Sequence, residues 1–169
     1  MVLIYTGNGK GKTSAAMGTA LRALGHGNKV HVVYFIKGTG PSSEQTALSG
    51  LPNITFSRFG VARYVDPENV TPEDKEEASK SLKAAHEAVM SGNYDLVILD
   101  EVNVAAAWKL IEIDSIIELI DNKPAHVDLI LTGRYADRRL MDRADLVTEM
   151  QEIKHPYASG SPAKSGIDY

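Results

Sequence analysis

The stretch TGNGKGKT at residues 6–13 places the strongest constraint on how this chain folds. It follows the apolar run of residues 2–5 and precedes a helical stretch of small residues, so the local order is strand, glycine-rich turn and helix. In this setting the glycines let backbone N–H groups converge on an anion, since no Cβ stands in the way. The Lys12 ammonium is expected to reach the outer phosphates of a nucleotide, and the Thr13 hydroxyl to coordinate magnesium. The residues expected to bind the nucleotide phosphates are Gly7, Asn8, Gly9, Lys10, Gly11, Lys12, Thr13 and Ser14.

The match to a standard phosphate-binding loop is incomplete. When the end of the pattern G-x-x-x-x-G-K-[ST] is aligned on residues 11–13, its first glycine falls on Thr6. The dinucleotide fingerprint G-x-G-x-x-G also fails, because its last glycine would fall on Lys12. The second apolar run ends at Lys37 rather than at an acidic residue suited to a ribose. These features favour a nucleoside triphosphate over NAD, and the alternative is a glycine-rich turn that binds nothing.

Near-continuous apolar runs alternate with helical patterns along the chain, which predicts a parallel sheet covered on both faces. Strands are expected at residues 2–5, 29–36, 54–59, 95–100, 127–132 and 146–150, with 54–59 the less buried. Helices are expected at residues 14–26, from 72 onward after an N-cap at Thr71, and at 104–111, 115–120 (capped by Asp114) and 136–144. Residues 37–43 are expected to form a flexible loop facing the ligand. The predicted fold is a single-domain α/β structure like the P-loop NTPases of the RecA type, with a mostly parallel sheet and helices on both faces. Residues 1–150 form the nucleotide-binding domain, and residues 151–169 an irregular tail packed on or near the site.

Composition sets limits on partners and location. The chain has 169 residues, a formal net charge of −4 and no cysteine, so it has no thiol nucleophile and no cysteine metal site. No stretch is strongly basic, which argues against a nucleic-acid partner. No run is long enough to span a membrane, and no basic leader precedes the first strand, so we expect a cytoplasmic protein without a membrane partner.

Two further strand ends carry candidate site residues. Asp100 and Glu101 follow the apolar run of residues 95–99, where a carboxylate can hold magnesium directly or through water. Arg134 follows the strand at 127–132 and is a candidate to contact phosphates. The five histidines show no metal spacing, and Trp108 is expected to pack in the core. From the residues alone, the chain is a magnesium–ATP-binding α/β domain whose second substrate is open.

Several motifs in order resemble the ATP-dependent corrinoid adenosyltransferases of the P-loop type. They are GKGKT at 9–13, FIKG at 35–38, LDE at 99–101, LTGR at 131–134, EIKHP at 152–156 and GIDY at 166–169, and they span nearly the whole chain. The resemblance implies that a reduced corrinoid, such as cob(I)alamin or cob(I)yrinic acid a,c-diamide, attacks the 5′-carbon of ATP and releases triphosphate. It also implies that the nucleotide is held with its phosphates reversed relative to ordinary P-loop enzymes. The catalytic residues would be Lys12, Thr13 and Glu101, and the metal ligands Thr13, Asp100 and Glu101.

The same resemblance implies a corrinoid site and further partners. The family has aromatic residues after the third strand, in a pattern near G-x-G-F-x-W, whereas this chain reads FGVARY at 59–64. Phe59 and Tyr64 are therefore the candidates to contact the corrinoid. An electron-donating flavoprotein or ferredoxin-like reductant and a homodimer are also implied. Two alternatives stay open: a conventional P-loop kinase or ATPase, and a protein that binds ATP or corrinoid without turnover.

Overall fold

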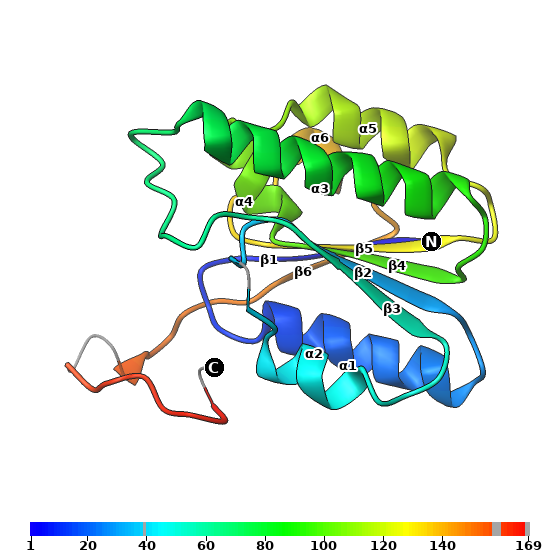
Figure 1. Ribbon diagram of the computed structural model, residues 1–169, viewed down its shortest axis with the longest axis horizontal. Helices are drawn as coiled ribbons and strands as arrows, with labels where there is room; N and C mark the ends of the chain where they lie inside the picture. The colour runs from blue at the N-terminus through cyan, green and yellow to red at the C-terminus, as the bar shows by residue number, and fades with distance from the viewer. Residues whose placement is uncertain (39, 157–159, 168–169) are drawn as a thin grey trace.

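A twisted parallel β-sheet runs through the middle of the molecule, with helices above and below it (Figure 1). The computed structural model describes residues 1–38, 40–156 and 160–167. Its strands are β1 (Val2–Thr6), β2 (Val30–Tyr34), β3 (Ile54–Arg58), β4 (Leu96–Asp100), β5 (Asp128–Thr132) and β6 (Leu146–Glu149). Its helices are α1 (Lys12–Gly25), α2 (Ser43–Leu48), α3 (Pro72–Met90), α4 (Val102–Ala107), α5 (Ile113–Asn122) and α6 (Arg138–Met141).

The strand order sets where a ligand can bind. In the described part of the chain six strands form one sheet in the order β3-β2-β4-β5-β1-β6, and every pairing is parallel. All the carboxyl ends therefore lie along one edge. The chain reverses its direction of winding after β3, so the connections that leave the neighbouring strands β2 and β4 run in opposite directions. Ligands of open α/β sheets bind outside the carboxyl ends at such a point. The predicted α/β class is confirmed, and the sheet, expected to be mostly parallel, is parallel throughout its described pairings.

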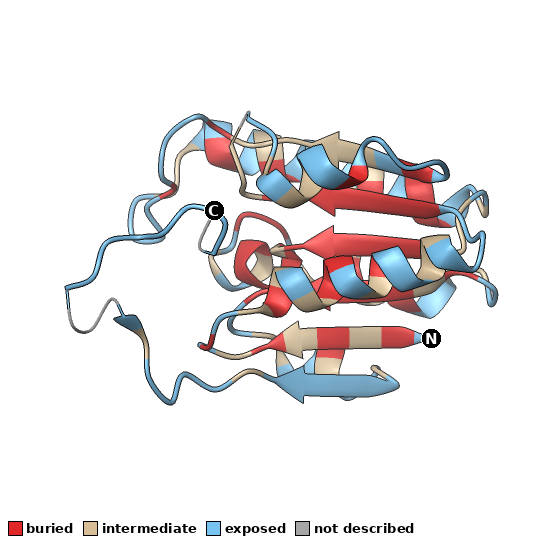
Figure 2. Ribbon diagram, turned by 90° about the horizontal axis from the view of Figure 1, so that it is seen from below, coloured by how far each residue is buried: buried red, intermediate tan, exposed pale blue. Residues whose placement is uncertain are grey.

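Burial follows the apolar patterns of the strands. β2 and β4 are buried along their whole length, whereas β3 is largely half-buried, as its polar sequence predicted. The edge strand β6 is exposed along its whole length, and it forms the pale blue border of the sheet in Figure 2.

The helices divide between the two faces of the sheet (Figure 1). On one face α1 packs its small side chains Ala16 and Ala20, both fully buried, against β2, β4 and β5. On the other face α3, α4 and α5 cover the same strands. The predicted start of α3 is confirmed, because the Thr71 hydroxyl accepts from Asp74 N–H while the Asp74 carboxylate accepts from Thr71 N–H.

Four helix predictions need correction. Helix α2 was not predicted: it begins at Ser43, the last residue of the expected loop, and it is capped by the Ser42 hydroxyl, which accepts a hydrogen bond from Gln45 N–H. α4 is shorter than expected and ends before Trp108. α5 begins at Ile113 after Glu112, so Asp114 is not the cap but lies in the first turn, where it pairs with Arg139. The expected helix at 136–144 is only the single turn α6, which begins after Asp137 caps it.

The tail leaves β6 at the carboxyl edge of the sheet and turns back toward α2 (Figure 1). Of the expected tail, residues 157–159, 168 and 169 lie outside the described residues, as does residue 39 of the expected loop. Within the described ranges no helix has both the length and the apolar character needed to cross a membrane.

Candidate active site

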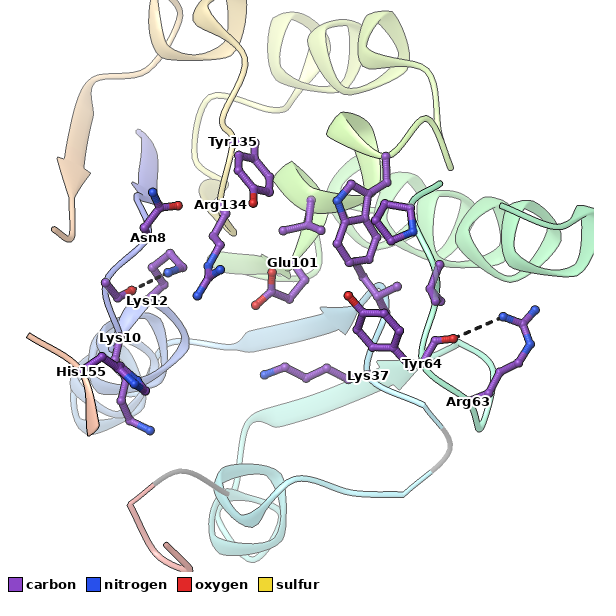
Figure 3. Close-up of a pocket in the computed structure, with 16 residues that line it drawn as sticks. Asn8, Lys10, Lys12, Lys37, Arg63, Tyr64, Glu101, Arg134, Tyr135 and His155 are labelled. Atoms are coloured by element: carbon purple, nitrogen blue, oxygen red, sulfur yellow. Dashed lines mark hydrogen bonds between the residues drawn. The ribbon is translucent and has the colours of Figure 1, made fainter. Parts of the chain in front are cut away.

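Two adjoining cavities open at the carboxyl edge of the sheet. The larger has a volume of about 610 Å³ and the smaller about 380 Å³, and they share Lys10, Lys12, Lys37 and Glu101. In Figure 3 the side chains of Lys12, Lys37, Glu101 and Arg134 extend into the larger space from different strand ends. The sheet topology therefore brings together the loop, the Asp100–Glu101 pair and Arg134, as the sequence predicted for neighbouring strand ends.

The glycine loop is shaped by the segment that follows β6 as much as by its own turn. Gly9 N–H donates to the Met150 carbonyl at 2.6 Å. A Cβ on Gly9 would lie 2.7 Å from the carbonyl carbon of Gln151, and one on Gly7 would meet the Met150 carbonyl oxygen. Gly11 has φ +110 and begins α1, a conformation that side chains rarely adopt. Two of the loop glycines thus permit close approach of the chain, and the third permits the turn into the helix.

The Lys12 side chain lies inside the glycine loop and holds two of its carbonyl groups. Its ammonium donates to the carbonyls of Gly7 at 2.8 Å and Gly9 at 2.6 Å, and the residue is only 8% exposed. Lys12 is therefore not an exposed loop lysine, because the loop wraps around its side chain. Burial lowers the pKa of Lys12, and the nearby Glu101 carboxylate opposes this.

A hydroxyl and a carboxylate meet where β4 ends beside α1. Thr13 Oγ1 donates to Asp100 Oδ1 at 2.9 Å, and Thr132 Oγ1 donates to the same oxygen at 2.7 Å. Asp100 is fully buried. Lys37 Nζ lies 2.7 Å from this Oδ2 as an ion pair, and 3.3 Å from Thr13 Oγ1.

Glu101 stands at the junction of the two cavities in a strained backbone conformation. Its φ of 63 is in the left-handed region, which non-glycine residues rarely adopt, and its N–H donates to Thr132 Oγ1 at 2.9 Å. Burial and the neighbouring Asp100 raise the pKa of Glu101, against the effect of Lys37, Lys12 and Arg134. Strain of this kind is concentrated at functional sites, where it fixes the direction of a side chain.

Aromatic and aliphatic side chains form the other wall of the larger cavity. Tyr64 and Trp108 lie edge to face, with ring centroids 6.4 Å apart. Val61 and Val65 are buried on either side of Tyr64, which leaves the tyrosine 78% exposed at the cavity. The rest of this wall comprises Ile36, Pro67, Val104 and Tyr135. Of the two predicted corrinoid residues, Tyr64 lines the cavity, whereas Phe59 is half-buried and lines neither of the two cavities.

The segment that carries Tyr64 is held at two points that precede the tyrosine. Gly60 N–H donates to a Glu77 carboxylate oxygen at 3.1 Å, and the Arg63 guanidinium pairs with Asp74 at 2.8 Å. Because Glu77 and Asp74 both lie in α3, that helix sets the position of the aromatic wall.

The sequence did not single out several of the residues that line the larger cavity. Lys37, Trp108, Tyr135 and His155 are the polar and aromatic members that matter most here. The sequence predicts Lys37 only as the residue that follows an apolar strand, and it predicts that Trp108 packs in the core. Trp108 does pack against the core, but it also lines the cavity. The available signal for Lys37 and Tyr135 was their place directly after strands β2 and β5, where parallel sheets present ligand-contacting residues.

A glycine loop between β1 and α1, with a hydroxyl at the start of α1 and two carboxylates at the end of β4, defines a P-loop nucleotide-binding protein. The chain belongs to the ATP:corrinoid adenosyltransferase family BtuR/CobO/CobP, whose family model matches residues 1–169. Corrinoid adenosyltransferase of Escherichia coli (strain K12) is 35% identical over 169 residues, covering 100% of this chain and 85% of the relative. Corrinoid adenosyltransferase CobA of Salmonella typhimurium is 36% identical over 171 residues, with 100% and 85% covered. Domain III of the Thermotoga maritima replication initiation protein DnaA overlaps with a TM-score of 0.41 at 15% identity, covering 88% of this chain and 53% of that one.

Proposed function

We propose that this chain transfers the 5′-deoxyadenosyl group of ATP to the Co(I) centre of a corrinoid and releases triphosphate. The observation that carries the proposal is the composition of the larger cavity, which has a phosphate loop and basic side chains at one end and an aromatic and aliphatic wall at the other. A triphosphate suits the first end, and the flat apolar face of a corrin ring suits the second. Membership of the adenosyltransferase family supports the pairing of these two substrates.

In this reaction the protein has to position the two substrates and stabilise the charge of the leaving group. Co(I) in the substrate is itself the nucleophile, so the chain needs no side-chain nucleophile or general base. Its tasks are to align cobalt with the 5′-carbon and to stabilise the departing polyanion. The loop N–H groups, the Lys12 ammonium and the Arg134 guanidinium supply positive charge for the second task.

We propose that Mg²⁺ binds with ATP at Thr13, Asp100 and Glu101. The donor set fits, because hydroxyl and carboxylate oxygens are the ligands that Mg²⁺ prefers, and the buried Asp100 Oδ2 is already paired with a positive charge, the Lys37 ammonium. Among the described residues no three His, Asp or Glu side chains gather as a metal cluster, at this site or elsewhere, so triphosphate oxygens would complete the coordination. When bound, the ion would neutralise charge on the leaving triphosphate.

We propose that Tyr64 and Trp108 contact the corrinoid face. Tyr64 is the member of the sequence-predicted pair that lines the cavity, and Trp108 lies against its ring. Large aromatic faces supply apolar contact area at low cost in side-chain entropy. We also propose that the tail closes the site, since His155 lines the larger cavity and Ile167 the smaller.

Further proposals concern the surroundings of the enzyme. A flavoprotein or ferredoxin-like donor would reduce the corrinoid to Co(I), as membership of the adenosyltransferase family suggests. A homodimer is supported by the exposed edge strand β6, where Leu146 and Val147 are 40% and 42% exposed. A cytoplasmic location suits both ATP and a reduced substrate.

An anaerobic assay with ATP, Mg²⁺ and chemically reduced cob(I)alamin tests the proposal. The corrinoid spectrum and the phosphate product are followed together. We expect the spectrum of adenosylcobalamin and stoichiometric triphosphate. ADP without a spectral change would indicate a conventional ATPase or kinase instead. Binding of both substrates without any product would indicate a carrier or sensor.

A further inference from the structure

The ammonium of Lys37 lies among the oxygens that we propose for the metal. It is 2.7 Å from Asp100 Oδ2 and 3.3 Å from Thr13 Oγ1. Thr13 donates its hydroxyl proton to Asp100 Oδ1, so the lone pairs of Oγ1 are left to face a cation. The cation that faces them in the structure is the ammonium of Lys37.

Lys37 and a divalent ion cannot share these oxygens. A magnesium ion binds oxygen at about 2.0–2.1 Å, so an ammonium within hydrogen-bond reach of the same atoms would overlap it and repel it. Without the ammonium, Asp100 would be a fully buried carboxylate with a bare oxygen, which is costly. Lys37 therefore supplies the positive charge that this carboxylate needs before any ligand arrives.

The backbone of Lys37 is fixed while its side chain has room to move. Arg58 Nη1 donates to the Lys37 carbonyl at 2.7 Å, and the same guanidinium donates to Gln45 Oε1 from Nη2 at 2.7 Å. The Lys37 side chain is 27% exposed and lines both cavities. Its ammonium can therefore leave Asp100 for a triphosphate in either cavity without any change in the fold of β2 or α2.

We infer that the Lys37 ammonium occupies the Thr13–Asp100 position and so excludes free divalent ions from it. Only a metal that binds together with a triphosphate displaces the ammonium. The inference rests on the proposed function, which places the metal at these oxygens. The triphosphate is the component that makes the exchange favourable, because its oxygens bind the displaced ammonium while they also ligate the metal. Lys37 thus acts as a specificity residue for the metal–nucleotide complex, and after displacement it adds to the positive charge around the leaving group.

Binding of Mn²⁺ without nucleotide tests the inference, with electron paramagnetic resonance as the readout of free and bound ion. The variant is Lys37→Met, which keeps the length of the side chain and removes its charge. The matched control is Lys83→Met, which removes the charge of an exposed lysine on α3 far from the cavities. We expect Lys37→Met to bind Mn²⁺ at least about tenfold more tightly than the unaltered protein, and Lys83→Met to bind it no more tightly. Equal Mn²⁺ affinity in Lys37→Met and the unaltered protein would overturn the inference.

A thermal-unfolding measurement provides a second readout that does not depend on activity. Lys37→Met should unfold at a lower temperature than the unaltered protein, because Asp100 loses its counterion, and Mn²⁺ alone should restore the loss. If Lys37→Met is too unstable to purify, Lys37→Gln serves in both experiments. A loss that Mn²⁺ does not restore would count against the inference.

Binding of Mn²⁺ together with ATP separates this inference from the proposed function. The unaltered protein should bind the Mn²⁺–ATP complex, and Asp100→Asn should weaken that binding. If it does, while Lys37→Met gains no affinity for the free ion, only the role of Lys37 fails. If the unaltered protein does not bind Mn²⁺–ATP, or if Asp100→Asn has no effect, the proposed metal position fails and the inference falls with it.

Discussion

Replacing Gly9 with alanine should destabilise the protein, whereas the same replacement at Gly18 should stabilise it. Gly9 lies against the segment that follows β6, and a Cβ there would be 2.7 Å from the carbonyl carbon and oxygen of Gln151 and 2.8 Å from the Met150 oxygen. Gly18 lies on the exposed side of α1, and a Cβ there would meet nothing within 4 Å. The pair therefore tests one explanation with opposite signs.

The magnitudes follow from these contacts. Ordinary contact begins at 3.4 Å, so the backbone at residues 150–151 must retreat by about 0.7 Å to admit a methyl group. Crowding of this kind costs about 1–3 kcal/mol, and loss of the Gly9 N–H bond to Met150 adds about 1 kcal/mol. At Gly18 alanine should gain about 0.5–1 kcal/mol, because glycine is the poorer helix former. For a chain of this size the Tm should fall by about 4–16 °C for Gly9→Ala and rise by about 1–4 °C for Gly18→Ala.

Thermal unfolding of the ligand-free variants, followed by circular dichroism, measures both changes. Working without nucleotide keeps any effect of Gly9 on phosphate binding out of the result. Urea unfolding gives the free energies directly, provided that the slope with denaturant is unchanged. Equal Tm values for the two variants would refute the reasoning, since they would mean that the segment after β6 does not pack on the loop.

Four other substitutions probe separate parts of the structure. Lys12→Met should weaken ATP binding by at least about tenfold and also lower the Tm, because the ammonium both faces the phosphates and closes the loop; titration calorimetry and unfolding measure the two effects. Trp108→Ala should weaken corrinoid binding by about 1–3 kcal/mol and leave ATP affinity unchanged, as fluorescence and calorimetric titrations would report. Burial raises the pKa of Glu101 in the folded protein, so its negative charge lowers the free energy of unfolding above that pKa. Glu101→Gln should therefore raise the Tm at neutral pH. The gain should vanish below the ordinary glutamate pKa, as unfolding scans at several pH values would report. Thr71→Ala should cost about 1 kcal/mol in urea unfolding, because α3 loses its cap.

Features that depend on local pattern were predictable from the sequence. The strands are apolar runs bounded by turn residues, and the start of α3 follows from Thr71, Pro72 and Asp74 within four positions. The loop at residues 6–13 was predictable for the same reason, because strand, glycines and helix are consecutive. His31 belongs to the same local pattern, because it lies in the apolar run of β2, where it is buried and its ring nitrogens pair with Thr55 and Ser57.

Features that depend on which strands are neighbours were not predictable. Lys37 meets Asp100 because β2 lies beside β4, with Tyr34 in register with Asp100, although β3 comes between them in the sequence. The burial of Lys12 likewise depends on the turn of the loop, which composition does not specify. The contact of Trp108 with Tyr64 joins two loops on different strand ends, so neither residue alone indicates it.

The position of β1 between β5 and β6 has a consequence for synthesis of the protein. Val2 pairs with Leu129 and Leu3 with Leu146, and Gly9 bonds to Met150. During synthesis β1 therefore has no neighbouring strand until β5 and β6 have been made. Sheets built from such distant pairings form slowly and leave strand edges open in the meantime. We therefore expect a nascent chain to remain unable to hold ATP until β6 has left the ribosome, because the loop after β1 is completed only by the segment that follows β6.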